Sequence, residues 1–164
     1  MVFRAIRVRV RTMTKKEKEI HDRAEIEAVI RKAEICRLGL SVDNCPYIVP
    51  LNFGFEGNCL YFHTAREGKK IDMIRQNNAV CFELEADCEV ARAESPCDWT
   101  MKFRSVIGYG KASLLTDAEK KRRALDVIMA HYSGQQGEYP EHLVDRLAII
   151  KVEIEEMTGK KSRY

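Results

Sequence analysis

The stretch from Tyr61 to Ile71 gathers most of the groups in this sequence that could do chemistry. A predicted strand ends in the hydroxyl of Thr64, and Gly68, Lys69 and Lys70 follow at the predicted start of a short helix. Lysines oppose the helix dipole at an N-terminus, but together with backbone N–H groups they can hold a phosphate there. The pattern therefore indicates a phosphate-binding site. The alternative is that Lys69 and Lys70 are two solvated surface lysines.

His63 is the candidate catalytic residue, because an imidazole can exchange protons near neutral pH. No acidic residue adjoins it in the sequence to orient its ring, so the simpler interpretation is a half-buried histidine packed beside the aromatic residues of its strand. The sequence has no nucleophile elbow of the serine hydrolases and no Gly-rich phosphate loop between a strand and a helix. No two cysteines have C-x-x-C spacing, so we expect no metal site.

The segment from Trp99 to Gly110 combines an aromatic residue, the cation Arg104 and the hydroxyl of Ser105 with apolar neighbours. This composition is typical of a subunit interface. The alternative is that Arg104 and Ser105 belong to the solvent face of an ordinary strand and that Trp99 packs in the core.

Hydrophobic periodicity predicts three helices and about six strands. The helical segments are 19–33, 68–77 and 116–132, and the strands are 36–40, 46–53, 59–64, 79–84, 99–115 and 147–154. A loop or a distorted excursion is expected over 85–98. Pro46 and Pro50 remove ladder donors, which favours an edge strand. Connections of hairpin length favour antiparallel pairing, and strand-rich chains of this size form sandwiches or barrels.

Composition indicates one globular domain, since the 164 residues are 45% hydrophobic and 32% charged. Several basic side chains lie in the first eighteen residues, so we expect a basic N-terminal arm at residues 1–18 and a single domain at residues 19–164. The remaining charge is close to balanced, which argues against a nucleic-acid partner. We expect no membrane span and no signal peptide. The six cysteines are then free thiols in a reducing cytoplasm, and the expected location is cytoplasmic.

Four segments together resemble a known family, namely 46–54, 60–71, 99–110 and the ending 154–161. They are similar to the FMN-binding split β-barrels related to pyridoxamine 5′-phosphate oxidase, and most similar to the nitroimidazole-resistance branch. The resemblance covers nearly the whole chain. It implies a mainly β fold, a six-stranded antiparallel split β-barrel with peripheral α-helices, and a homodimer with FMN bound at the subunit interface.

The resemblance also implies roles for individual residues. The strand matching 48–53 passes the FMN ring and offers it backbone groups, which makes cofactor-binding residues of Val49, Pro50, Leu51, Asn52 and Phe53. Residues matching His63 and Thr64 line the cofactor, and Gly68, Lys69 and Lys70 bind its phosphate. Ser105 falls where the oxidases contact the FMN of the partner subunit.

The sequence departs from the oxidases in two places. Their strand is basic at both ends, whereas Ile48 and Phe53 are apolar, and their C-terminal tryptophan and arginine have no counterpart before Tyr164. Oxidation of pyridoxamine phosphate is therefore not expected. The expected activity is transfer of electrons from reduced flavin to a small acceptor, such as a nitroaromatic. The alternative is a non-catalytic flavin or haem carrier with His63 or His131 as the haem ligand.

Overall fold

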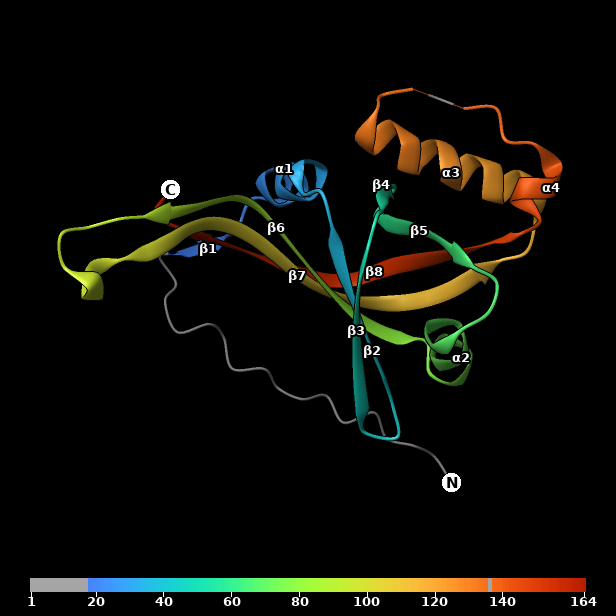
Figure 1. Ribbon diagram of the computed structural model, residues 1–164, viewed down its shortest axis with the longest axis horizontal. Helices are drawn as coiled ribbons and strands as arrows, with labels where there is room; N and C mark the ends of the chain where they lie inside the picture. The colour runs from blue at the N-terminus through green and yellow to red at the C-terminus, as the bar shows by residue number, and fades with distance from the viewer. Residues whose placement is uncertain (1–17, 136) are drawn as a thin grey trace.

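The computed structural model describes residues 18–135 and 137–164, so residues 1–17 of the predicted basic arm lie outside the described residues. The described chain forms one curved antiparallel sheet with helices packed around it (Figure 1). The elements are β1 (Glu19–Ile20), α1 (Arg23–Lys32), β2 (Cys36–Val42), β3 (Cys45–Leu51), β4 (Gly54–Glu56), β5 (Cys59–Ala65), α2 (Lys69–Gln76), β6 (Ala79–Ala91), the 3-10 turn η2 (Pro96–Asp98), β7 (Thr100–Leu115), α3 (Ala118–Tyr132), α4 (Glu141–Val144) and β8 (Leu147–Ser162).

The strands are hydrogen-bonded in the order β3-β2-β6-β7-β8-β5-β4, and β1 pairs with β8. The predicted mainly β, antiparallel fold is confirmed, and each of the six predicted strands is present. The strand number is corrected from six to eight within the described residues. The two additional strands, β1 and β4, have 2 and 3 residues, which is too short to give an alternating hydrophobic pattern.

The two end strands of this order, β3 and β4, are joined by Asn52 and Phe53 alone. The three chain steps from Leu51 to Gly54 can span at most about 11 Å. Six strand spacings in a flat sheet would separate its end strands by about 29 Å. The sheet must therefore roll up until its ends approach each other. In the described residues β3 pairs only with β2 and β4 only with β5, so the rolled sheet stays split.

The corner between β3 and β4 is held by the last turn of α3. Phe53 is fully buried, and its N–H donates to the hydroxyl of Tyr132 over 3.0 Å. The same hydroxyl donates to the carbonyl of Glu34 over 2.8 Å. His131 Nε2 lies 2.8 Å from the carbonyl oxygen of Ala33, and because a carbonyl only accepts, Nε2 carries the proton. We call these contacts the corner clamp.

The predicted start of the first helix is corrected. The first helix begins at Arg23 and not at residue 19, because the side chain of Asp22 caps it by accepting from Ala24 N–H. Glu19 and Ile20 instead pair with the end of β8. The helix packs onto the sheet through the buried Ile26, Val29 and Ile30. The N-caps of the other two helices are Gly68 before α2 and Asp117 before α3, so these helices begin one and two residues after their predicted starts.

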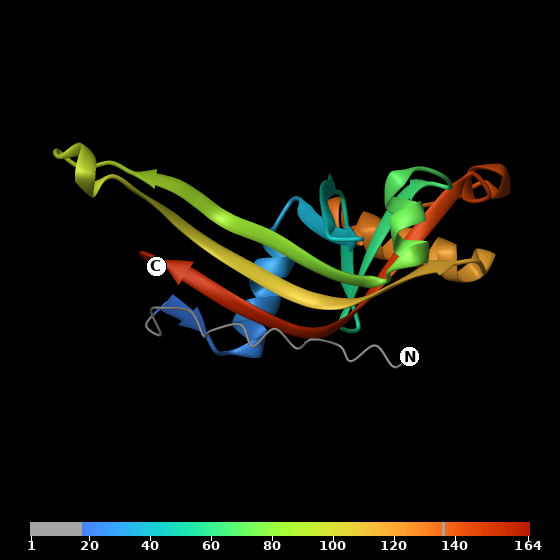
Figure 2. The ribbon, with the colours of Figure 1, turned by 90° about the horizontal axis from the view of Figure 1, so that it is seen from below.

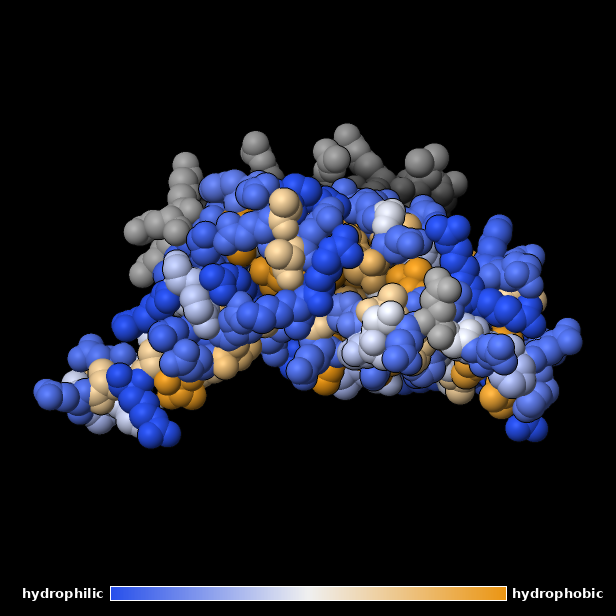
Figure 3. Space-filling view, turned by 90° about the horizontal axis from the view of Figure 1, so that it is seen from above, coloured by the Kyte–Doolittle hydropathy of each residue, from blue (hydrophilic) through white to orange (hydrophobic). Residues whose placement is uncertain are grey.

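Of the loop or distorted excursion predicted over 85–98, the first half, residues 85–91, is strand. β6 continues to Ala91 past a bulge between Ala86 and Glu89, where Asp87 adopts a φ of 58°. β8 likewise continues to Ser162 and does not end at Ile154. β6 and β7 extend beyond the sheet as a hairpin that Figure 3 shows projecting from the body. Both faces of such a hairpin are exposed, so its sequence lacks the one-sided hydrophobic pattern of a sheet strand.

The six cysteines lie in the described residues and are free thiols. Cys36 is fully buried, and this burial raises the pKa of its thiol. Cys81, which the sequence also placed among buried residues, is exposed, because its strand position faces outward. No helix among the described residues has the length and apolar character that crossing a membrane requires.

Removing the Tyr132 hydroxyl should destabilise the fold, because the buried Phe53 N–H loses its acceptor. We expect Tyr132→Phe to lower the free energy of unfolding by about 1–3 kcal/mol, as measured by urea denaturation. Tyr164→Phe is the matched control. It also deletes a hydroxyl bonded to a backbone carbonyl, that of Asp87, but at an exposed chain end, where about 0.5 kcal/mol is expected. Equal losses would contradict the clamp.

Candidate functional site

An opening in the sheet lies beside the end of β5. β4 begins at Gly54, opposite Tyr61. Beyond that point, 63–65 pair with β8 only, within the described residues. The strand that could have covered this edge, β3, turns away to pair with β2. We call the opening between residues 49–53, at the end of β3 and the corner after it, and residues 63–65 of β5 the split.

The start of α2 lies at the same opening. Gly68 is the N-cap residue and carries no side chain to cap the helix; its carbonyl accepts from Ile71 N–H over 2.9 Å. Lys69 and Lys70 occupy the first two helical positions. The ammonium of Lys69 lies 4.6 Å from the centre of the Tyr47 ring on β3. The two lysines thus lie at the start of a helix, as the sequence predicted, and the structure places Lys69 of this uncapped N-terminus against β3.

The β3 residues differ in what they can offer. Val49 and Leu51 are half-buried against the core, while Pro50 and Asn52 are exposed. Phe53, which the sequence placed in the cofactor site, has its ring and its N–H in the corner clamp. Its role there is structural, and the lining of the split comes from the four residues before it.

The prolines also shape this strand. Pro46 and Pro50 are four residues apart, so their nitrogens point to the same edge of β3. Because this edge faces away from β2, the hydrogen bonds between β2 and β3 are all kept. The free edge of β3 lacks two of its N–H donors. Such an edge resists pairing with another strand.

The two candidate histidines have different surroundings. His63 lies near the end of β5, opposite Ile149 of β8, and its side chain is exposed. The expectation of a half-buried, packed histidine is therefore wrong. Thr64 points the other way and is 8% exposed. His131 Nε2 is bonded to the Ala33 carbonyl, and its ring packs 4.3 Å from that of Phe53. Binding haem through Nε2 of His131 would break the corner clamp.

Ser105 is not part of the split within one chain. The register places Ser113 of β7, not Ser105, opposite Lys151, which in turn pairs with Tyr61 of β5. The eight residues from Ser105 to Ser113 span about 26 Å of strand. Ser105 therefore lies far along β7 from the split of its own chain.

Ser105 instead belongs to a face of the sheet that no described helix covers, as Figure 2 shows. Two cross-strand rows on this face follow from the register, namely Ile48–Gly39–Cys81–Tyr109 and Pro50–Arg37–Glu83–Ile107. Ile48, Tyr109 and Ile107 are 66%, 42% and 44% exposed. We call the surface formed by these two rows and Ser105 the uncovered face.

The uncovered face contains a charged cluster that sequence reasoning missed. Arg37 Nη1 lies 3.1 Å from Glu83 Oε2 and 3.0 Å from Glu85 Oε1. Partial burial, and after it the neighbouring Glu85 carboxylate, raise the pKa of Glu83 to about 7. Alternation of Glu83 and Glu85 in a strand is visible in the sequence, but the strand that supplies their arginine is not.

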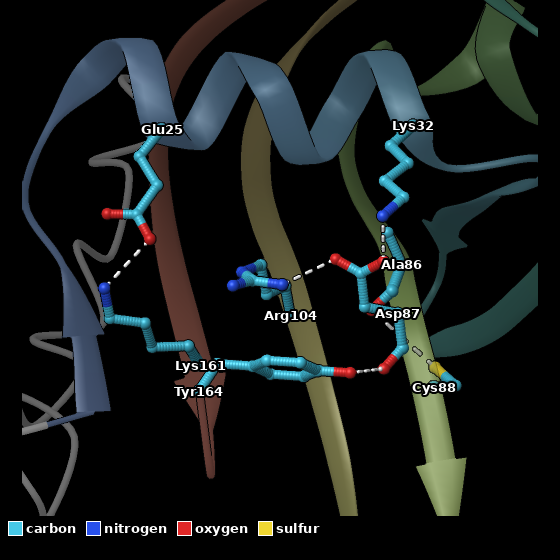
Figure 4. A network of polar contacts seen from close by, with 8 residues as sticks. All are labelled: Glu25, Lys32, Ala86, Asp87, Cys88, Arg104, Lys161 and Tyr164. Carbon is cyan, nitrogen blue, oxygen red and sulfur yellow. Dashed lines mark hydrogen bonds and ion pairs between the residues drawn. The ribbon is translucent and has the colours of Figure 1, made fainter.

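Arg104 is corrected from an interface cation to a structural one. It lies on the opposite face and binds the Asp87 carboxylate over 2.6 Å, as Figure 4 shows. Lys32 of α1 binds the same carboxylate, and the Tyr164 hydroxyl donates to the Asp87 carbonyl over 2.7 Å. Hydrogen bonds from Lys32 and then Arg104 lower the pKa of Asp87. This network fixes the root of the β6–β7 hairpin to α1 and to the end of the chain.

Across residues 18–135 and 137–164, no three His, Cys, Asp or Glu side chains gather as a metal site would require. The split combines three kinds of group that could bind a ligand: backbone and apolar surface on β3, the hydroxyl of Thr64, and the lysines at the start of α2. This arrangement suits a molecule with a flat apolar part and an anionic end.

The family profile of pyridoxamine 5′-phosphate oxidase matches residues 22–161 of the chain. A crystal structure from Bacteroides thetaiotaomicron VPI-5482, of a proposed 5-nitroimidazole antibiotic resistance protein, is 37% identical, with a TM-score of 0.78 over 87% of this chain and 86% of that one. The FAD and heme binding protein of Mycobacterium smegmatis is 16% identical, with a TM-score of 0.79 over 90% of this chain and 74% of that one; at this identity the likeness shows the fold alone.

An uncharacterized protein of Rhizobium meliloti (strain 1021) is 34% identical over 65 residues. The match covers 40% of this chain and 42% of that protein. The chain therefore aligns with less than half the length of this curated relative.

The N-cap of α2 should tolerate only glycine. Gly68 has φ 123° and ψ 169°, a region essentially closed to other residues, so Gly68→Ala should lower the free energy of unfolding by about 2–3 kcal/mol. A Cβ at this position meets open space, so the loss would come from the backbone. Gly57→Ala is the control, with open space and a φ of 57°, where about 1 kcal/mol is expected. Urea denaturation measures both, and a larger loss at Gly57 would contradict the assignment.

Proposed function

The chain belongs to the pyridoxamine 5′-phosphate oxidase family, and from this membership and the geometry of the split we propose that it binds FMN and acts as an oxidoreductase toward a small acceptor. The observation that carries the proposal is the start of α2. There an uncapped helix N-terminus with Gly68, Lys69 and Lys70 lies against β3 at the edge of the split. This is the combination that binds a phosphate monoester.

The residues present fit FMN at both of its ends. The lysines and the first amides of α2 suit the phosphate, and the aromatic contact with Tyr47 restrains the Lys69 side chain near β3. The surface from Val49 to Asn52, with few free N–H groups on its edge, suits a flat ring that contacts backbone. A bound flavin supplies the electron-transfer chemistry, while the chain supplies binding, orientation and exclusion of water.

We propose a nitroaromatic as the acceptor, on the strength of the likeness to the Bacteroides protein at 37% identity. Pyridoxamine phosphate is a poor candidate on structural grounds. The two strand positions that are basic in the oxidases are Ile48, exposed on the uncovered face, and Phe53, buried in the corner clamp. Neither offers a charge to a second phosphate.

The visible absorption spectrum of the purified full chain tests the proposal. Flavin absorbance, or uptake of added FMN, followed by reoxidation of the reduced protein by a nitroaromatic, supports it. No flavin and no uptake of FMN would overturn it, and a Soret band on haem titration would favour the haem carrier in its place.

The phosphate anchor predicts how two variants should behave. Lys69→Ala or Lys70→Ala should weaken FMN binding by about 1.5–3 kcal/mol, the range for a hydrogen bond to a charged group. Riboflavin, which lacks the phosphate, should bind both variants as it binds the wild type. Lys120→Ala, at an exposed position in the first turn of α3, is the control. Fluorescence titration measures the affinities; equal losses for FMN and riboflavin would show that the lysines act through folding.

We further propose a homodimer in which Ser105 of one chain reaches the split of the other. The uncovered face supports this, because it exposes Ile48, Ile107 and Tyr109 on the same side of the sheet as Ser105. A twofold contact pairs such a face with itself.

If each site uses two chains, FMN should stabilise the dimer by mass action. We expect sedimentation over a dilution series to show tighter association of the FMN-loaded protein than of the apo protein. Ser105→Ala should reduce this difference without changing association of the apo protein. A monomer that binds FMN at full affinity would refute the shared site.

A further inference from the structure

The cluster of Arg37, Glu83 and Glu85 has more negative than positive charge. Glu83 and Glu85 are two residues apart on β6, so their side chains leave the same face of the strand. Both contact a single guanidinium nitrogen, Arg37 Nη1, at 3.1 and 3.0 Å. One positive charge can balance only one carboxylate. The second carboxylate therefore gains by holding a proton.

The cluster lies within the apolar part of the uncovered face. The register places Ile107 directly opposite Glu83 on β7, and Pro50 directly opposite Arg37 on β3. The next row holds Ile48 and Tyr109, both exposed. Any partner that covers these apolar residues must also remove water from Glu83.

The occupant of this face that fits best is a second copy of the chain. The face carries both signs of charge. Arg37 contacts Glu85, and the cross-strand row of Glu85 and Ser105 continues to Lys160 on β8. A self-complementary contact needs such a mixture, since each patch meets itself.

We propose that protonation of Glu83 controls association of the uncovered face between two copies of the chain. The inference rests on the dimer that the proposed function includes. The geometry gives the sign. Covering Ile107 and its neighbours desolvates Glu83, which favours the neutral carboxylic acid. Association therefore takes up a proton at Glu83 and is strongest where that proton is already bound.

The other groups that face Glu83 do not reverse this direction, in which association favours the protonated carboxyl of Glu83. Arg37 from β2 is already shared with Glu85. The thiols of Cys36 and Cys88 both interact with Glu83 and have raised pKa values, so they stay neutral near pH 7. From β7 the opposing residue is Ile107, which carries no charge. In the free chain the pKa of Glu83 is about 7, so the dimer should weaken as the pH rises above neutrality.

Sedimentation of the full chain, apo and FMN-loaded, from about pH 6 to about pH 8.5 tests this. Each Glu83 contributes up to about tenfold per pH unit to the dissociation constant, so a dimer with two of them should weaken by up to about a hundredfold per unit above neutrality. Glu83→Gln, which is neutral at every pH, should associate tightly and without pH dependence. In Glu85→Gln, Glu83 is the only carboxylate that contacts Arg37, which lowers the pKa of Glu83. The dimer of this variant should therefore begin to weaken at a lower pH than the wild type.

Glu119→Gln is the control, since Glu119 is an 86% exposed side chain on α3, away from the uncovered face. It should keep the wild-type pH profile. The inference would be overturned by a dimer whose dissociation constant does not change with pH, or by one that associates more tightly as the pH rises. Either result would leave the proposed function standing. A chain that stays monomeric at every pH would overturn the inference and the proposed dimer together, while the flavin spectrum would still report on cofactor binding.

Discussion

The two-residue corner at Asn52 and Phe53 is the constraint on which the rest of the structure depends. It joins the two end strands of a seven-strand path, so the sheet has to roll up. The hydroxyl of Tyr132 accepts from Phe53 and donates to Glu34, and in doing so fixes α3, the corner and the α1–β2 linker to one another. Because β3 turns off to β2 at this corner, the end of β5 is left without a strand beside it. The split and the position of α2 follow from that.

The same rolled sheet separates two kinds of surface. Its inner face holds the core, including Phe62, Phe82 and Leu84, and α1 extends that packing toward the hairpin. The opposite face of β6, β7 and β8 has no described helix on it (Figure 2). It exposes the apolar side chains of Ile107 and Tyr109. The groups proposed to bind a ligand lie at the split, and those proposed to meet a second copy of the chain lie on the uncovered face. The fold alone does not determine the ligand, because function depends on the groups placed on it.

Two charged clusters differ in the ratio of positive to negative side chains, and this ratio decides whether their carboxylates stay charged near neutral pH. Asp87 has two cations, Lys32 and Arg104, and its pKa is lowered, so its charge is held and the hairpin root is fixed. Glu83 shares a single arginine with Glu85, and its pKa is raised toward neutrality. The first cluster is structural over the physiological range. The second can respond to pH and to what covers it.

Local physical chemistry let the sequence predict the turns, the caps and the six longer strands, along with the two lysines at the start of α2. Asp43 and Asn44 adopt φ values of 50° and 60° in the first hairpin, which such residues tolerate. Asp117 caps α3 by accepting from the N–H of Lys120, three residues further along the chain. The remaining features depend on partners far away in the chain. Tyr132 contacts Phe53, 79 positions away in the chain, and Arg37 contacts Glu83, 46 positions away. Asp87 lies in a bulge, where β6 has one residue more than the segment of β7 that pairs with it. Strand register decides which side chains become neighbours, and a one-residue slip would replace all of them, so only the tertiary structure could place Ser105 away from the split and Glu83 beside Arg37.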